Sequence, residues 1–255
     1  MSESTGFVES SLENGLMTIR FFHPAHNSLP SDLLIRLAQQ IQSAGQNSSV
    51  KIIILKSEGD KTFCAGASFD ELIKIENLEQ GQSFFSGFAN VINACRKIDK
   101  IVLARVHGKA IGGGVGIAAA ADYCLANKWA TIRLSELAVG IGPFVIGPVV
   151  ERKMGFSAFS QLALNPSEWQ TAAWAKEKGL FMEVFETTAQ LDEYIIYFTN
   201  MLLTYSPQAL KELKRIFWQG TNHWDQLLID RAEISGRLIL EEHAKSAIAA
   251  FKQKS

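Results

Sequence analysis

Gly108-Lys109-Ala110-Ile111-Gly112-Gly113-Gly114-Val115-Gly116 is the most informative stretch of this chain. The apolar run before it, residues 101–106, is typical of a buried strand, and the alanine-rich run after it, which ends at Ala121, is typical of a helix. Each glycine in a helix costs about 1 kcal/mol relative to alanine. A ligand that touches the backbone would offset that cost, and close packing of the helix on the strand is the alternative explanation.

A second small-residue turn, Phe63-Cys64-Ala65-Gly66-Ala67, follows the strand-like run 51–56. Alone it is a weak signal, because small residues are common in turns. The interval from Ala67 to Gly113 has room for one helix and one strand, so two neighbouring parallel strands would end at the same edge of a sheet, where ligands tend to bind. If the N–H groups of both turns face one point, they form an oxyanion hole from backbone alone.

Glu136 is the candidate acid–base residue, because it lies in the mostly apolar stretch 133–140. Burial would raise the pKa of its carboxyl group towards neutrality, which suits proton transfer. The alternative is a solvent-exposed glutamate or one paired with Arg133. Cys64 lies beside the first turn, but no flanking basic residue would activate a thiolate there. The five histidines are scattered, and no Ser-His-Asp arrangement or Gly-x-Ser-x-Gly motif is present.

Alternation of strands and helices in the first half predicts an α/β core with a largely buried sheet. From Pro143 onward the periodicity is helical. The expected strands are 16–22, 51–56, 101–106, 123–126 and 131–134. The expected helices include one capped by Ser31-Asp32, one around 84–92, and later ones at 145–154, 157–164, 168–178, 188–203, 207–219 and 223–252.

Composition excludes several classes of function. The chain has 255 residues, and 25 Lys and Arg against 26 Asp and Glu give a net charge of −1, so a nucleic-acid partner lacks electrostatic support. Residues 1–15 lack the apolar segment of a secretory signal, and the longest apolar run, 110–121, is shorter than the about 20 residues that span a bilayer. The three cysteines are too widely spaced for a metal site. We expect a cytoplasmic protein with no metal and no membrane partner.

Together these motifs resemble the crotonase, or enoyl-CoA hydratase/isomerase, family. The resemblance runs from the His23-Pro24-Ala25 turn through the two glycine turns, Ala121-Asp122-Tyr123 and Ser135-Glu136-Leu137 to Gly155. It implies an α/β, ClpP-like spiral of ββα units over residues 1–195 and a helical trimerisation region over 196–255. It further implies a homotrimer or a dimer of trimers that acts on an acyl-CoA thioester, with coenzyme A as part of the substrate and no other cofactor.

The resemblance also assigns roles to individual residues. The N–H groups of Ala67 and Gly113 would hold the thioester oxygen, and Glu136 would transfer the proton. The residues that would bind the substrate or its CoA moiety are Ala25, Ala65, Gly66, Phe69 and Gly112, with Phe251 and Lys254 reaching a neighbouring site.

One departure bears on the reaction. Hydratases of this family carry a second glutamate just after the glycine triplet, and that position is Gly116 here, while Ser68 stands where an aspartate is common. The glycine-rich segment 140–150 is similar to that of bacterial methylglutaconyl-CoA hydratases, which belong to leucine degradation. We therefore expect hydration of a 2-enoyl-CoA, including branched or carboxylated ones, with Arg105, Lys109, Arg133 or Arg152 as candidates to meet a substrate carboxylate. The alternatives are a 3-enoyl-CoA isomerase that uses one glutamate, a more distant decarboxylase or dehydratase, and a non-catalytic acyl-CoA-binding scaffold.

Overall fold

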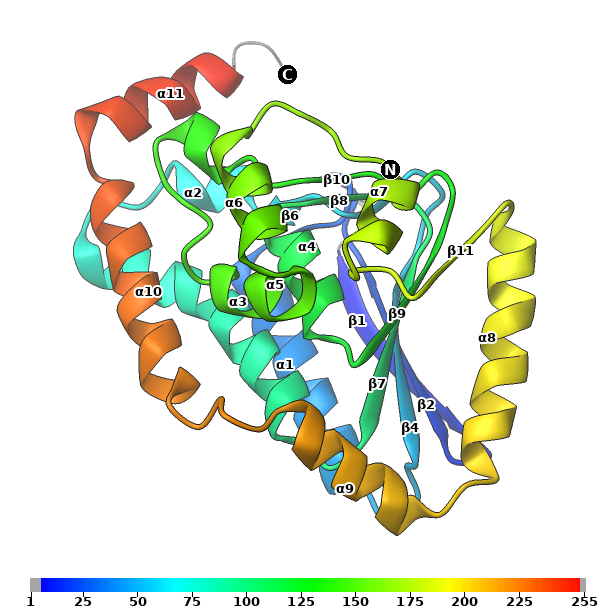
Figure 1. Cartoon of the computed structure of the whole chain (residues 1–255). Coiled ribbons are helices and arrows are strands. Elements are labelled where there is room, and N and C mark those ends of the chain that lie inside the picture. The colour runs from blue at the N-terminus through cyan, green and yellow to red at the C-terminus, as the bar shows by residue number, and fades with distance from the viewer. Residues whose placement is uncertain (1–5, 253–255) are drawn as a thin grey trace, which may run out of the picture.

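A twisted six-stranded sheet forms the centre of the molecule (Figure 1). The computed structural model describes residues 6–252, with side chains up to residue 250. The strand order is β1-β2-β4-β7-β9-β11, and all neighbours are parallel except β1 and β2. Two smaller parallel sheets have the orders β10-β8-β5 and β3-β6. The strands are β1 (Phe7–Glu13), β2 (Leu16–Phe22), β3 (Ser28–Leu29), β4 (Ile52–Ser57), β5 (Thr62–Cys64), β6 (Gly66–Ala67), β7 (Ile101–Val106), β8 (Lys109–Ile111), β9 (Tyr123–Asn127), β10 (Ile132–Arg133) and β11 (Glu183–Phe185).

A repeated unit generates this arrangement. In each turn of the chain one strand joins the large sheet, the next joins a small sheet, and a helix follows, as in β7, β8 and α4. This confirms the expected α/β spiral of ββα units. The helices are α1 (Ser31–Gln46), α2 (Phe69–Leu72), α3 (Leu78–Lys97), α4 (Gly113–Ala120), the 3₁₀ helix η1 (Glu136–Val139), α5 (Gly147–Met154), α6 (Phe156–Leu164), α7 (Ala172–Glu177), α8 (Thr188–Leu203), α9 (Pro207–Phe217), α10 (Trp224–Leu238) and α11 (Glu242–Lys252).

Both faces of the sheet are buried, which explains the unbroken apolar sequence of β4. Ile53 and Leu55 face the main core, which also contains side chains of α1, α3 and α4. Ile52 and Ile54 face a smaller core made with α8. Alternate residues of a strand point to opposite faces, so a strand covered on both sides must be apolar throughout. In Figure 1, α8 lies on one side of the sheet, where Leu210 of α9 also joins the smaller core, and α1 and α3 cover the other side.

A buried polar cluster attaches the C-terminal helices to this core. The Asp122 carboxylate accepts hydrogen bonds from the backbone N–H of Val102 (2.8 Å), from Lys214 Nζ (2.7 Å) and from Trp218 Nε1 (2.8 Å). The Lys214 and Asp122 side chains are 2% and 1% exposed. Helices α3 and α10 also lie side by side, at a crossing made by Gly81 and Gly236. The boundary at residue 195 lies within α8 and stays a prediction.

The structure differs from the sequence-based expectation in four places. Strand β1 was not expected, because most of its side chains are exposed and polar at the edge of the sheet. Strand β11 was missed because it is only three residues long. The expected helix 223–252 breaks into α10 and α11, and α1 is preceded by Pro30 rather than capped by Ser31, whose hydroxyl donates instead to Glu71 Oε2.

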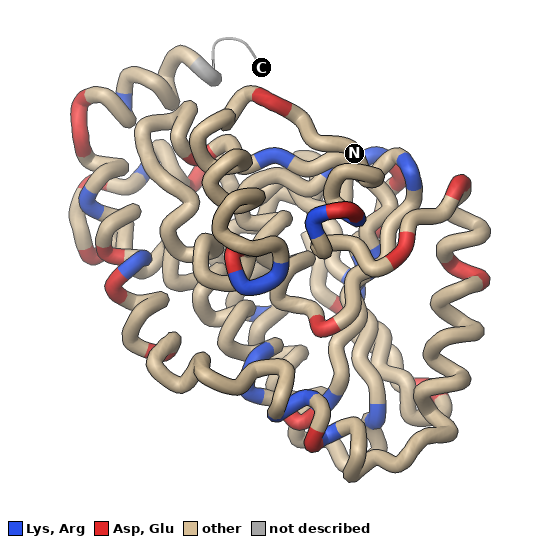
Figure 2. The backbone as a smooth tube through the Cα atoms, viewed as in Figure 1, with Lys and Arg blue, Asp and Glu red and all other residues tan. Residues whose placement is uncertain are grey.

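Charged residues of both signs are interspersed along the backbone (Figure 2). No helix within residues 6–252 is both long enough and apolar enough to cross a membrane.

Candidate active site

The two glycine turns lie against one another. Strands β5 and β8, which lead into them, are parallel neighbours, so both turns leave the small sheet at the same end. Gly66 has a φ of +87°, and a β-carbon there would lie 2.9 Å from the carbonyl oxygen of Ile111 and 3.4 Å from the amide nitrogen of Gly113. Gly113 is the first residue of α4, where a helix leaves its N–H groups without an intrahelical partner. Glycine is thus required here for close approach of the two backbones.

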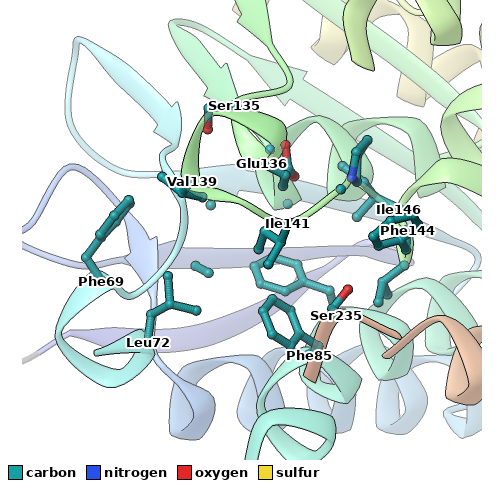
Figure 3. Close-up of a pocket in the computed structure, with 18 of the residues that line it drawn as sticks. Phe69, Leu72, Phe85, Ser135, Glu136, Val139, Ile141, Phe144, Ile146 and Ser235 are labelled. Carbon is teal, nitrogen blue, oxygen red and sulfur yellow. The ribbon is translucent and has the colours of Figure 1, made fainter. Parts of the chain in front are cut away.

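A cavity of about 70 Å³ opens beside these turns (Figure 3). Ala67 and Gly113 line it, together with Glu136. The rest of the lining that Figure 3 labels is mostly apolar and comes from α2, α3, α10, η1 and the segments on either side of η1. The structure therefore brings the three residues to which sequence reasoning assigned catalytic roles to one cavity.

Glu136 is held in an apolar enclosure. Its Oε2 atom is buried and has no hydrogen-bond partner among the described residues. Burial raises the pKa of the Glu136 carboxyl group to about 7, and the nearby Arg133 guanidinium lowers it only in part. A β-carbon on Gly112 would lie 2.7 Å from Glu136 Oε1, so the second glycine turn forms one wall of the enclosure. A carboxyl group with this pKa can both accept and return a proton near neutral pH.

The position of the missing second glutamate is filled by a hydrocarbon side chain. A β-carbon on Gly116 would lie 2.4 Å from Cγ2 of Ile146. Ile146 is 3% exposed and itself lines the cavity. Of the described residues that line the cavity, Glu136 is the only one that ionises, and the other polar side chains are the hydroxyls of Ser135 and Ser235.

A larger cleft of about 610 Å³ adjoins the inner cavity, and the two share Ala65, Ala67, Phe69 and Ser135. Ala25 lines the outer cleft only, whereas Gly66 and Gly112 line the inner cavity only. Phe251 belongs to α11, but its side chain lies outside the described part of the chain, and Lys254 lies wholly outside it. The residues expected to bind the substrate therefore divide between two adjoining spaces, one small and one several times larger.

Comparison with known proteins accords with this geometry. The family model described as enoyl-CoA hydratase/isomerase matches residues 11–255. The chain belongs to this family. It is 29% identical over 232 residues to the short-chain-enoyl-CoA hydratase of Clostridium acetobutylicum, covering 90% of this chain and 88% of that protein. It is 26% identical over 264 residues to the peroxisomal Delta(3,5)-Delta(2,4)-dienoyl-CoA isomerase of Arabidopsis thaliana, covering 97% and 93%.

The fold is shared with solved enoyl-CoA hydratases. The crystal structure of the enzyme from Bacillus halodurans superposes with a TM-score of 0.87 at 20% identity, over 95% of this chain and 99% of that one. This chain is thus a crotonase-family member whose relatives include both hydratases and isomerases.

The four cations considered for a substrate carboxylate all lie outside the inner cavity of this family member. Arg105 pairs with Asp192, with 2.9 Å between Nη2 and Oδ2, and Arg152 donates to the carbonyl oxygens of Phe217 and Gln219. Lys109 and Arg133 line only the outer cleft. Neither Arg105 nor Arg152 lines either cavity.

Trp169 is a cleft residue that sequence reasoning missed, since the tryptophans were assigned to packing or subunit contact. Lys109 Nζ lies 5.3 Å from the centre of its ring, and the Arg133 guanidinium carbon lies 4.4 Å from it. Backbone hydrogen bonds between Ile132 and Gln170 hold this segment beside β10. No local motif marks that contact, because it joins segments that are far apart in the sequence.

The Cys64 thiol is unsuited to nucleophilic chemistry. It is fully buried, and burial raises its pKa to about 12. A thiol with this pKa stays protonated at neutral pH and is a poor nucleophile. Its sulfur instead accepts a hydrogen bond from the backbone N–H of Gly66.

Proposed function

We propose that this protein isomerises a 3-enoyl-CoA to the 2-enoyl-CoA, with Glu136 as the one acid–base group. The observation that carries the proposal is that the cavity beside the glycine turns holds a single carboxylate, while Ile146 fills the space of a second. Moving a double bond along a chain takes one proton from one carbon and returns it to another, which a single group of pKa about 7 can do.

The proposed reaction has two proton transfers. The thioester oxygen accepts hydrogen bonds from the N–H groups of Ala67 and Gly113. The Glu136 carboxylate removes a proton from C2, and the electron pair spreads over a dienolate whose oxygen charge these N–H groups stabilise. Glu136 then delivers the proton to C4, which leaves the double bond between C2 and C3. Coenzyme A is part of the substrate in this proposal, and no other cofactor takes part.

The CoA portion would occupy the outer cleft. Lys109 and Arg133 supply positive charge to this cleft, and Trp169 supplies a flat aromatic surface beneath both. Phosphate groups and an adenine ring are the parts of coenzyme A that such groups suit. Ala65 and Phe69, which line both spaces, would mark the passage of the thioester arm.

Hydration of a 2-enoyl-CoA is the second candidate, and the similarity to a clostridial hydratase favours it. Glu136 would then have to orient the water and pass on its proton without a partner acid. The apolar lining around Ile146 offers a water few hydrogen-bond partners.

The two candidates are separated by incubation of 3-hexenoyl-CoA in deuterated water. We expect rapid formation of 2-hexenoyl-CoA, with little 3-hydroxyhexanoyl-CoA. Hydration of 2-hexenoyl-CoA at a comparable rate would favour the hydratase. Binding of both thioesters without any turnover would support the scaffold alternative, and Glu136→Gln would then leave the binding profile unchanged.

A homotrimer or a dimer of trimers remains a proposal. Leu213, Ile216 and Phe217 of α9 are between 44% and 55% exposed, which would favour their burial against another copy. Light scattering coupled to gel filtration measures the mass directly. A monomeric mass at micromolar concentration would contradict the proposal.

A further inference from the structure

We propose that the inner cavity selects a short, uncharged acyl chain, and that Phe85 is the side chain that limits its length. The proposal rests on the proposed function, because it places the thioester oxygen between Ala67 and Gly113 and the acyl chain beyond them. It adds a substrate class and a specificity-determining residue, neither of which follows from membership of the family.

The size of the inner cavity limits the chain. An engineered protein cavity of roughly 150 Å³ admits benzene, which has six carbons. The cavity beside Glu136 has a volume of about 70 Å³, near half of that. It has room for about three to five carbons beyond the thioester carbonyl carbon, which corresponds to acyl groups of about four to six carbons. The wide outer cleft does not offer a continuation, because it lies on the other side of Ala67 and Phe69, where the CoA portion would bind.

The end of the cavity is built from two tightly packed helices. Phe85 of α3 and Ser235 of α10 lie together at one side of the cavity, away from Glu136 (Figure 3). Phe85 is 8% exposed and Ser235 is 1% exposed. At the nearby crossing, a β-carbon on Gly81 would lie 2.7 Å from the Cα atom of Gly236, so α3 and α10 cannot move closer or separate without loss of packing. The wall is therefore stiff, and the Phe85 ring rather than helix movement sets the depth.

Adjacent residues on α3 provide a natural control. The Phe84 ring lies edge-on to Phe85, with 5.2 Å between ring centres, and it is buried to a similar extent. Phe84 faces away from the cavity, towards a surface groove that Glu71 and Ser31 also line. Truncation of either ring removes the same atoms from the same helix, but only truncation of Phe85 deepens the cavity.

The lining also disfavours a charged acyl chain. Among the described residues around the cavity, Glu136 is the only ionisable group, and it is itself an acid. A second carboxylate in this space would be desolvated without a cation to pair with, which is strongly unfavourable. Arg105, Lys109 and Arg152 do not line the cavity, and Arg133, although near enough to lower the pKa of Glu136, lines only the outer cleft. The cavity therefore fits an apolar acyl group better than the carboxylated acyl group considered in the sequence analysis.

Calorimetric titration with saturated acyl-CoAs tests the inference without requiring turnover. Butyryl-, hexanoyl-, octanoyl- and decanoyl-CoA form the length series, and glutaryl-CoA is the charged probe. We expect each methylene up to hexanoyl-CoA to tighten binding by about fourfold, with no further gain or a loss beyond that length. Glutaryl-CoA should bind at least about tenfold more weakly than butyryl-CoA. Binding that tightens steadily through decanoyl-CoA, or glutaryl-CoA binding as tight as butyryl-CoA binding, would overturn the inference.

Variants of the cavity lining show which side chain limits the length of the acyl chain. Phe85→Leu should move the optimum to octanoyl-CoA or longer, whereas Phe84→Leu should keep the native profile. Ile146→Val, which removes one methyl group from another part of the lining, provides a milder enlargement should Phe85→Leu fold poorly. An equal shift in both phenylalanine variants would contradict the role of Phe85.

The outcomes also separate the two proposals. If the saturated series shows the expected limit but 3-hexenoyl-CoA is not isomerised, only the proposed function fails. If 3-hexenoyl-CoA is isomerised but decanoyl-CoA binds most tightly, only the inference on chain length fails.

Discussion

Gly112 and Glu136 are in such close contact that a side chain at position 112 would displace the carboxylate: a β-carbon there would lie 2.7 Å from Glu136 Oε1. The backbone of Gly112 also has a φ of +52°, a region that L-residues rarely adopt. The same glycine thus immediately precedes α4 and borders the carboxylate. Position 112 therefore links the geometry of the backbone donors to that of the proton-transfer group.

Gly112→Ala should lower turnover by at least about tenfold, because the new methyl group displaces the Glu136 carboxylate. Gly59→Ala is the matched control, since Gly59 also has a positive φ of +88° but nothing lies within 4 Å of its β-carbon position. Both variants should lose some stability from backbone strain. Steady-state kinetics on 3-hexenoyl-CoA should show the loss of turnover in Gly112→Ala alone, and an equal loss in Gly59→Ala would refute the contact as its cause.

Glu136→Gln should reduce turnover by at least about 10²-fold while leaving the fold and acyl-CoA binding in place. The amide has nearly the same shape but cannot accept the C2 proton. Circular dichroism and butyryl-CoA titration check that the variant is folded and binds. Activity within a few-fold of native would remove Glu136 from the mechanism.

The rate should rise with pH and level off above neutrality, because Glu136 acts as a base and the pKa of its carboxyl group is about 7 in the folded protein. The profile of kcat/KM between pH 5 and 9 measures this ionisation in the free enzyme. A flat profile over that range would show that Glu136 is already ionised at pH 5.

Ionisation of Glu136 should raise the reaction rate as the pH rises, but it should lower the stability of the folded protein. The folded-state pKa of Glu136 is raised above the unfolded value of 4.5, so its stabilising contribution is fully present below pH 4.5 and is lost as pH rises through 7. Glu136→Gln should therefore become more stable relative to the native protein between pH 5 and pH 8, by about 3 kcal/mol at most. Urea unfolding at both pH values measures the difference, and an unchanged difference would contradict the raised pKa.

Lys214→Met should lower the free energy of unfolding by about 3 to 5 kcal/mol, because it leaves the buried Asp122 carboxylate without its charge partner. Lys211→Met, three residues earlier on α9, breaks an exposed ion pair with Asp99 and should cost less than about 1 kcal/mol. Chemical unfolding of the two variants side by side tests the contrast. Similar values for both would show that Lys214 contributes little.

Most of the fold and the central part of the site could be predicted from short stretches of the sequence. Both glycine turns and Glu136 were found from sequence because each stands out within a few residues of its neighbours. The ends of the sheet were missed for the opposite reason: β1 is polar on its exposed face, and β11 is only three residues long.

The walls of the cavity could not be read from sequence. The sequence shows that no acid stands at position 116. It does not show that Ile146 fills the space beside Gly116, because that contact depends on how α5 packs against α4. Likewise Phe85 and Ser235 meet only because α3 and α10 cross at two glycines. Such contacts between distant segments have no local pattern, so the acyl-chain preference had to come from the structure.

Cys64, Cys95 and Cys124, the full complement of cysteines, are all buried, and burial raises each thiol pKa to about 12. The native protein should therefore be nearly inert to maleimide reagents. A single cysteine introduced on the rim of the outer cleft would accept a fluorophore selectively, without prior removal of the natural thiols. The labelled protein could then be titrated with its ligand and the binding followed by fluorescence.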